Sequence, residues 1–179
     1  MKYFSTRDKS LEFGFKDILL RGLAPDGGLF LPTKIKKYSQ NDLKNLSKLS
    51  YVDLATEIIF NFCKDDIVKD QLKILIEKAY SNFTSKEVVK FKKIANHNLL
   101  ELYHGPTLAF KDIAMQVIGN MYDCLKLSAN KAINIIVATS GDTGAAAISA
   151  LNDRKNICLL YTSDAADDSL RVDLGGRRI

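Results

Sequence analysis

The stretch that most constrains this chain runs from Leu102 to Asp112 and reads Leu-Tyr-His-Gly-Pro-Thr-Leu-Ala-Phe-Lys-Asp. It predicts an apolar strand that ends in a polar turn and is followed by a helix. Lys111 falls in the first turn of that helix, where free N–H groups and the helix dipole favour acids and disfavour an ammonium ion. Two interpretations follow: a neutral lysine amine suited to Schiff-base chemistry, or a solvated lysine whose stem covers the apolar residue beside it.

A second stretch has the same strand, loop and helix order. Ala132–Ala138 is a short apolar run rich in β-branched residues, Thr139-Ser-Gly-Asp-Thr-Gly144 follows it, and Ala145–Leu151 is helical in character. The loop brings hydroxyls and backbone N–H groups to a helix start, which favours an anion, and we expect Gly141 and Gly144 to allow close approach and positive φ. The spacing is that of neither a Walker A loop nor a Gly-x-Gly-x-x-Gly turn. An ordinary strand-to-helix turn remains the alternative.

Composition excludes several classes of protein. The net charge of +5 comes from scattered lysines without the aromatic and basic pattern of RNA-binding modules, so we expect no nucleic-acid partner. Three well-separated cysteines and two histidines predict neither a metal site nor a disulfide framework. No apolar run is long enough to span a membrane, and the N-terminus has no apolar signal core. We therefore expect a cytoplasmic protein; the oligomeric state is not predictable from the sequence.

The first 81 residues predict a mainly helical domain. Short strands are expected near Lys2–Thr6 and Leu29–Leu31, and helical spacing runs from Phe13 to Arg21 with Gly22 as its stop. Three further helices are expected to start after one capping residue each, with the first of them reaching Leu49; the caps are Ser39, Ser50 and Asp66. Their apolar stripes are core positions, because no chemistry-bearing group interrupts them.

From Phe83 onward, strands and helices alternate. Strands are expected at Val88–Phe91 and Asn98–Tyr103, a long helix at Phe110–Leu127, and a last strand at Asn156–Tyr161. Alternation of this kind with continuous apolar strands predicts an α/β fold with a parallel sheet covered on both faces.

Taken together, these motifs resemble the threonine synthases, a family of fold-type II enzymes that use pyridoxal 5'-phosphate (PLP). His104–Asp112 is similar to the family's cofactor-lysine motif, and Ser140–Gly144 is similar to its substrate-carboxylate loop. The N-terminal segments Tyr3–Arg7 and Leu19–Phe30 also match. The resemblance covers roughly Met1 to Tyr161. It implies a threonine synthase-like N-terminal domain over residues 1–81 and part of a tryptophan synthase β-like catalytic domain over residues 82–161.

The resemblance also implies a reaction and a set of site residues. The family converts O-phospho-L-homoserine and water to L-threonine and phosphate. Lys111 would bind the PLP aldehyde and then act as a base. The substrate carboxylate would lie on the loop, with Thr107 as a further contact; the loop residues are Ser140, Gly141, Asp142, Thr143 and Gly144. Asp142 would also contact the cofactor's 3-oxygen, where a second oxyanion is unfavourable unless a proton is shared or the side chain points away.

Other residues of these motifs are expected to be structural. His104 is interpreted as a turn residue, and Asp112 as a stabiliser of the helix N-terminus rather than an acid catalyst. Residues 162–179 are polar and turn-rich, depart from the family, and are interpreted as a non-native tail. The family's phosphate-binding glycine loop is not found before them, so we expect the 179-residue chain to be an inactive fragment.

Three alternatives remain open from the sequence. The chain could be a noncatalytic phosphate- or nucleotide-binding α/β module that does not need Lys111. It could belong to another fold-type II lyase, such as a cysteine synthase or a threonine dehydratase. It could also be an inert fragment of any of these.

Overall fold

In the computed structural model, residues 1–124, 132–139 and 141–162 are described. The chain divides into two units, Met1–Ser81 and Asn82–Ile179. Within the described ranges, no helix is both long and apolar enough to cross a membrane.

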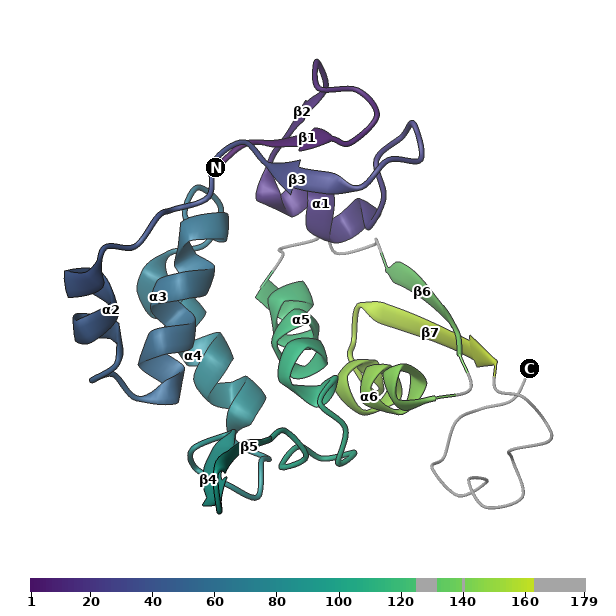
Figure 1. Ribbon diagram of the computed structural model, residues 1–179. Helices are drawn as coiled ribbons and strands as arrows, with labels where there is room; N and C mark the ends of the chain where they lie inside the picture. Colours follow the sequence, from purple (N-terminus) through teal and green to yellow (C-terminus); the bar gives the residue numbers. More distant parts are fainter. Residues whose placement is uncertain (125–131, 140, 163–179) are drawn as a thin grey trace. The chain divides into compact units, whose positions relative to one another are not determined.

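A small antiparallel sheet opens the first unit. Strand β1 (Tyr3–Ser5) lies between β2 (Glu12–Phe13) and β3 (Phe30–Pro32), with Tyr3 opposite Pro32 and Ser5 opposite Phe30. Helix α1 (Phe15–Arg21) follows β2 and ends at Gly22, whose φ of 71° is the left-handed conformation that glycine adopts without strain. The predicted strand near the N-terminus and the predicted helix are therefore confirmed (Figure 1).

Hydrogen bonds tie the turn before β3 to the end of β1. The Asp26 carboxylate accepts the Ser5 hydroxyl at 2.7 Å and the Gly28 N–H at 2.9 Å. Arg7 donates to the Asp26 carbonyl at 3.0 Å. A Cβ on Gly28 would lie 2.2 Å from Ser5 Oγ, so glycine is required there by space rather than by a ligand.

Three helices complete the first unit: α2 (Gln40–Leu46), α3 (Tyr51–Cys63) and α4 (Lys69–Tyr80). Ser39 and Ser50 cap α2 and α3 as predicted, each accepting a backbone N–H three residues on. Helix α2 ends at Leu46 rather than Leu49. The prediction that Asp66 starts the third helix is wrong: Asp66 N–H bonds back to the Cys63 carbonyl, and Val68 is the residue before α4.

The second unit begins with a hairpin. Strands β4 (Lys90–Ile94) and β5 (His97–Glu101) are antiparallel, with Lys92 opposite Leu99 and a two-residue turn at Ala95 and Asn96. Both segments were predicted as strands, but they form a two-stranded sheet of their own rather than part of a parallel sheet. Ala95 takes a φ of 51°, which lets the chain reverse in two residues.

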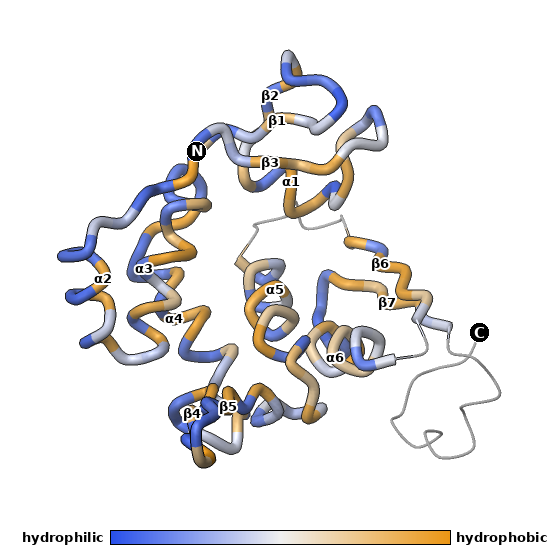
Figure 2. The backbone as a smooth tube through the Cα atoms, viewed as in Figure 1, coloured by the Kyte–Doolittle hydropathy of each residue, from blue (hydrophilic) through white to orange (hydrophobic). Residues whose placement is uncertain are grey.

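The parallel part of the second unit is formed by β6 (Ile133–Ala138) and β7 (Ile157–Thr162), joined by α6 (Asp142–Leu151). Helix α5 (Asp112–Cys124) precedes β6 and begins two residues later than predicted; its predicted end at Leu127 lies outside the described residues. One strand face packs on α5 and α6 around Ala147, Ala150 and Leu151. Figure 2 shows the apolar character of β6 and β7.

The prediction of a sheet covered on both faces is wrong for the described residues. Side chains along β6 and β7 alternate between half-buried and exposed, and Ile136, on the second face, is 77% exposed. The continuous apolar runs of β6 and β7 are typical of strands buried on both faces, but among the described residues helices pack on only one face of the two strands. The predicted tail starts at Thr162, which is the last residue of β7, and the rest of it lies outside the described residues.

Candidate active site

The loop before α5 is held at both ends by side chains. At its start, His104 is 8% exposed, and its Nε2 lies 3.1 Å from Glu101 Oε2. The His104 carbonyl accepts the Thr84 N–H at 2.9 Å. Glu101 is 3% exposed and also contacts Lys92 Nζ at 2.5 Å. The hydrogen bond from Lys92 lowers the pKa of the Glu101 carboxyl, so the buried carboxylate stays charged and fixes the strand end.

At the end of the loop, Asp112 is fully buried. Its carboxylate accepts the Thr107 N–H on Oδ2 at 2.8 Å and the Thr107 hydroxyl on Oδ1 at 2.7 Å. A Cβ on Gly105 would lie 2.4 Å from Asp112 Cβ, so only glycine fits against this carboxylate. Leu108, between the two ends, takes a left-handed φ of 59°. The expectation that His104 and Asp112 are structural agrees with these contacts.

Lys111 sits immediately before α5. Its side chain is half-buried, and its Nζ lies 5.1 Å from the centre of the Phe110 ring. Among the described residues, no carboxylate forms an ion pair with this amine. A lysine without an acidic partner keeps its nitrogen available for a carbonyl compound.

The second loop begins α6. The Gly141 N–H bonds to the Thr139 hydroxyl at 3.2 Å, and the Gly144 N–H to the Gly141 carbonyl at 3.0 Å. No hydrogen bond among the described residues uses the N–H of Asp142 or Thr143, so two donors remain at the helix start. These donors suit a carboxylate. Ser140, predicted to belong to the same loop, lies outside the described residues.

The two glycines of this loop differ in their surroundings. A Cβ on Gly144 would meet Thr139 Cγ2 at 2.8 Å, whereas a Cβ on Gly141 would meet nothing within 4 Å. Neither has a positive φ, so the expectation of left-handed backbone here is wrong. Gly144 is needed for the packing of α6 on the preceding strand end, and Gly141 leaves open space beside the free donors.

Helices α5 and α6 pack against each other in the second unit. Gln116 Nε2 donates to Ser149 Oγ at 3.3 Å, Gly119 faces Ala150, and Arg154 pairs with Asp123. These contacts join the middle and end of α5 to the last turn of α6 and the segment after it. Lys111 precedes α5, and Asp142 begins α6. The structure describes no direct contact between Lys111 and the described part of the second loop.

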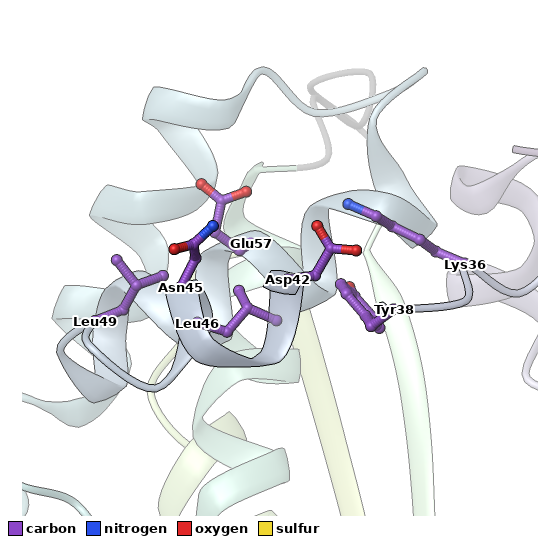
Figure 3. A pocket seen from close by; sticks show the side chains of 7 residues that line it. All are labelled: Lys36, Tyr38, Asp42, Asn45, Leu46, Leu49 and Glu57. Carbon is purple, nitrogen blue, oxygen red and sulfur yellow. The ribbon is translucent and has the colours of Figure 1, made fainter. Parts of the chain in front are cut away.

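Two cavities are present, and the larger borders the second loop through Thr139 and Thr143. One, of about 400 Å³, is apolar apart from a few hydroxyls and is lined by Met115, Ile118, Tyr122, Ile135, Ile136, Val137, Ala138, Thr139, Thr143, Ala147 and Leu151. The other, of about 220 Å³, lies in the first unit and is lined by Lys36, Tyr38, Asp42, Asn45, Leu46, Leu49 and Glu57 (Figure 3). Neither includes Lys111. The second sets two carboxylates against one ammonium, which disfavours a phosphate.

Residues 2–80 match the family model described as threonine synthase N terminus. Over 90% of its length, the chain is similar to the crystal structure of PLP-bound threonine synthase from Brucella melitensis, with 40% identity and a TM-score of 0.83, and it covers 35% of that chain. The chain belongs to the threonine synthase family. Its fold is accordingly that of the fold-type II PLP enzymes.

Curated relatives carry the same family name. Threonine synthase from Saccharomyces cerevisiae is 41% identical over 87% of this chain, and threonine synthase-like 2 from Xenopus laevis is 38% identical over 89%. The chain spans about a third of the length of these threonine synthase relatives: 33% of the first and 34% of the second.

The residues on this chain fit the family's cofactor. A half-buried lysine without an acidic partner among the described residues suits an aldehyde. The N–H groups of Asp142 and Thr143, which make no hydrogen bond within the described ranges, suit the carboxylate of an amino acid. Sequence reasoning found both of these groups. It missed the buried Glu101 and the hydrogen bonds of Asp112 to Thr107. The acid at 101 could have been noticed as a charged residue in an otherwise apolar strand segment, but its partner Lys92 is nine residues away.

Proposed function

We propose that this chain carries the cofactor lysine and the carboxylate loop of a PLP-dependent threonine synthase, which converts O-phospho-L-homoserine and water to L-threonine and phosphate. The observation that carries the proposal is Lys111 itself, a half-buried lysine at the start of α5 that forms no ion pair among the described residues. Residues 1–81 are then the family's N-terminal domain, and residues 82–161 are part of its catalytic domain.

PLP, when bound, supplies an electron sink that stabilises negative charge on the substrate carbon skeleton. Lys111 would hold the cofactor aldehyde and, once displaced by the substrate amine, would move protons at the adjacent carbons. The N–H groups of Asp142 and Thr143 would hold the substrate carboxylate, with Ser140 and the two loop glycines around it.

Two predicted contacts are constrained by the geometry. The Thr107 hydroxyl gives its hydrogen to Asp112, so in this arrangement it contacts a substrate only as an acceptor. Asp142 is exposed in the first turn of α6, so its side chain has room to turn away from the oxygen of a bound cofactor. A cytoplasmic location belongs to the same proposal.

The direct test is covalent trapping. The 179-residue chain is incubated with PLP and reduced with borohydride, and the labelled peptides are mapped by mass spectrometry. We expect Lys111 to take more label than any other lysine, and Lys111→Arg to lose that label while Lys93→Arg retains it. Lys93 is a suitable control because it is an exposed lysine of the β4–β5 hairpin. Label spread over exposed lysines, with none on Lys111, would contradict the proposal.

A second test addresses the carboxylate loop. Gly141→Val places a branched side chain in open space, so the fold tolerates it while ligand approach is blocked. We expect O-phospho-L-homoserine to bind at least about tenfold more weakly, with a much smaller change for PLP, as measured by spectral titration. Equal substrate affinity in both proteins would contradict the assignment of this loop.

A further inference from the structure

The geometry points to Thr107 and Asp112 as positioning residues that fix the backbone carrying Lys111. This inference rests on the proposed function of Lys111 and deepens it. Asp112 follows Lys111 directly, and Thr107 lies four residues before the lysine. Their two hydrogen bonds close a ring through the Asp112 side chain and the backbone from 107 to 112. Lys111 is one of the residues in this ring.

The two hydrogen bonds use both carboxylate oxygens, one for a backbone donor and one for a side-chain donor. A carboxylate that accepts two hydrogen bonds in a buried setting is held in one orientation, because any rotation leaves a buried acceptor without a donor. Asp112 has no exposed surface. The two hydrogen bonds therefore hold the loop conformation without a contribution from solvent.

Gly105 makes the arrangement tight. Its Cα packs so closely on Asp112 that an added Cβ would lie 2.4 Å from both Cβ and Oδ2 of the acid. Gly105 thus packs against one side of the Asp112 carboxylate. The N–H and hydroxyl of Thr107 donate to the same carboxylate. Leu108, in the left-handed conformation, is the residue at which the chain bends to complete the ring.

The opposite end of the loop is fastened by His104 and Glu101. Because both ends of the loop are held, its backbone has little conformational freedom. The Cα of Lys111 is therefore fixed in position. A lysine that must meet an aldehyde at one geometry gains from such a fixed start, since a misplacement of about 1 Å can cost on the order of 100-fold in rate.

The test compares four forms of the 179-residue chain: the unmodified protein, Thr107→Val, Thr107→Ser and the control Ser50→Ala. The valine variant removes the hydroxyl donor at nearly constant volume, and the serine variant keeps it. Ser50 and Asp53 form a matched Ser–Asp capping pair at the start of α3, in the first unit, so the control measures the loss of a similar hydrogen bond elsewhere.

The first readout does not involve the cofactor. Amide hydrogen exchange is followed in peptides covering residues 104–113. We expect exchange in Thr107→Val to be about tenfold faster than in the unmodified protein, with Thr107→Ser within about twofold of it and Ser50→Ala unchanged. Equal exchange in Thr107→Val and the unmodified protein would overturn the inference, whether or not Lys111 binds PLP.

The second readout is the fraction of PLP trapped on Lys111 by borohydride. We expect it to fall about tenfold in Thr107→Val and to be restored in Thr107→Ser, while Ser50→Ala lowers the melting temperature without changing the label. If the unmodified chain takes no label on Lys111, the proposed function fails but the exchange result still decides the inference. If Thr107→Val is labelled as fully as the unmodified protein, the hydroxyl does not position the lysine and the inference is wrong.

Discussion

At the scale of single residues, several glycines are required by space rather than by backbone conformation. Gly28 has a negative φ, yet its Cα lies so close to Ser5 that no side chain fits. The same is true of Gly105 and Gly144, which pack on Asp112 and Thr139. In the Asp-Gly-Gly turn, only Gly27 takes the left-handed conformation, at a φ of 75°. The two glycines of that turn therefore serve different purposes.

This difference predicts the cost of adding one methyl group. Gly28→Ala should destabilise the protein by about 1–3 kcal/mol, because the new Cβ would displace Ser5 from Asp26. Gly14→Ala should cost less than about 1 kcal/mol, since its Cβ would meet Asp17 at an ordinary 3.5 Å. Urea unfolding monitored by circular dichroism gives both values. Equal stabilities for the two variants would show that the Ser5–Asp26 contact yields easily.

A charged residue in the β4–β5 hairpin predicts a pH effect. The hydrogen bond from Lys92 lowers the pKa of Glu101, so between the lowered and the ordinary value the unfolded chain binds a proton that the folded chain does not. The stability that Glu101 contributes is thus complete above its ordinary pKa and is lost as pH falls through the lowered one.

Glu101→Gln should remove this dependence. We expect the variant to be less stable than the unmodified protein at pH 7 and to approach it at pH 3, as measured by urea midpoints at both values. A difference that is the same at pH 3 and pH 7 would mean that packing, not charge, is lost in the variant.

At the scale of secondary structure elements, α5 and α6 are held together through a glycine. A Cβ on Gly119 would lie 2.5 Å from the carbonyl oxygen of Ala150, and Arg154 donates to that same oxygen at 2.6 Å. The helices can approach closely here because neither presents a bulky side chain. Asn120, next to this contact, is 2% exposed. Its Nδ2 donates to the Gln116 carbonyl at 2.8 Å within α5, and its Oδ1 has no hydrogen-bond partner among the described residues.

Gly119→Ala should therefore separate the two helices. We expect a destabilisation of about 1–3 kcal/mol, although alanine has the higher helix propensity, because the obstacle is a backbone oxygen that cannot rotate away. Ala114→Gly is a useful contrast: it lies on an exposed part of α5 and should cost only about 1 kcal/mol through propensity. Thermal unfolding of both variants checks this. A stabilised Gly119→Ala would show that the helix pair adjusts freely.

At the scale of the whole molecule, acid and alkali should both weaken the fold. Hydrogen bonds to serines lower the pKa of several surface carboxyls, including Asp8, Asp26 and Asp42. Burial raises the pKa of Tyr3 to about 12. A carboxyl with a lowered pKa loses its contribution to folding stability as pH falls below about 4. A tyrosine with a raised pKa loses its contribution to folding stability as pH rises from about 10 to 12.

We expect the urea midpoint to be highest between about pH 5 and 9 and to fall on both sides. Tyr3→Phe removes the ionisable hydroxyl and its 2.7 Å hydrogen bond to the Phe62 carbonyl, so it should be less stable at pH 7 but should not lose further stability through tyrosine 3 at pH 11. An identical alkaline decline in both proteins would assign the effect to other tyrosines.

Local signals predicted the parts of this fold that local contacts determine. The capping serines Ser39 and Ser50 identified the starts of α2 and α3, since the cap lies within one turn. The Leu102–Asp112 stretch and the 139–144 loop were recognised because loop residues and apolar runs alternate sharply there. Asp66 misled the prediction because an aspartate caps a turn as readily as a helix.

Contacts between distant residues were not predictable from such signals. The pairing of β4 with β5 depends on a turn at Ala95 without glycine, and the partners of Glu101 come from another strand and from the next loop. The Thr107–Asp112 bonds depend on a left-handed leucine, which no propensity favours. Side-chain partners of this kind depend on the three-dimensional path of the chain, and hydrophobic periodicity carries no information about that path.

The fit of Gly105 against Asp112 has a consequence for how this segment can evolve. A methyl group at 105 would collide with the Cβ of residue 112 itself, so position 105 cannot change alone without loss. A lineage that accepts alanine at 105 should be found with glycine at 112, and it should then also be free to replace Thr107. Substitutions at these three positions are thus expected to be correlated among relatives, and the lysine between them should tolerate such drift only when all three change together.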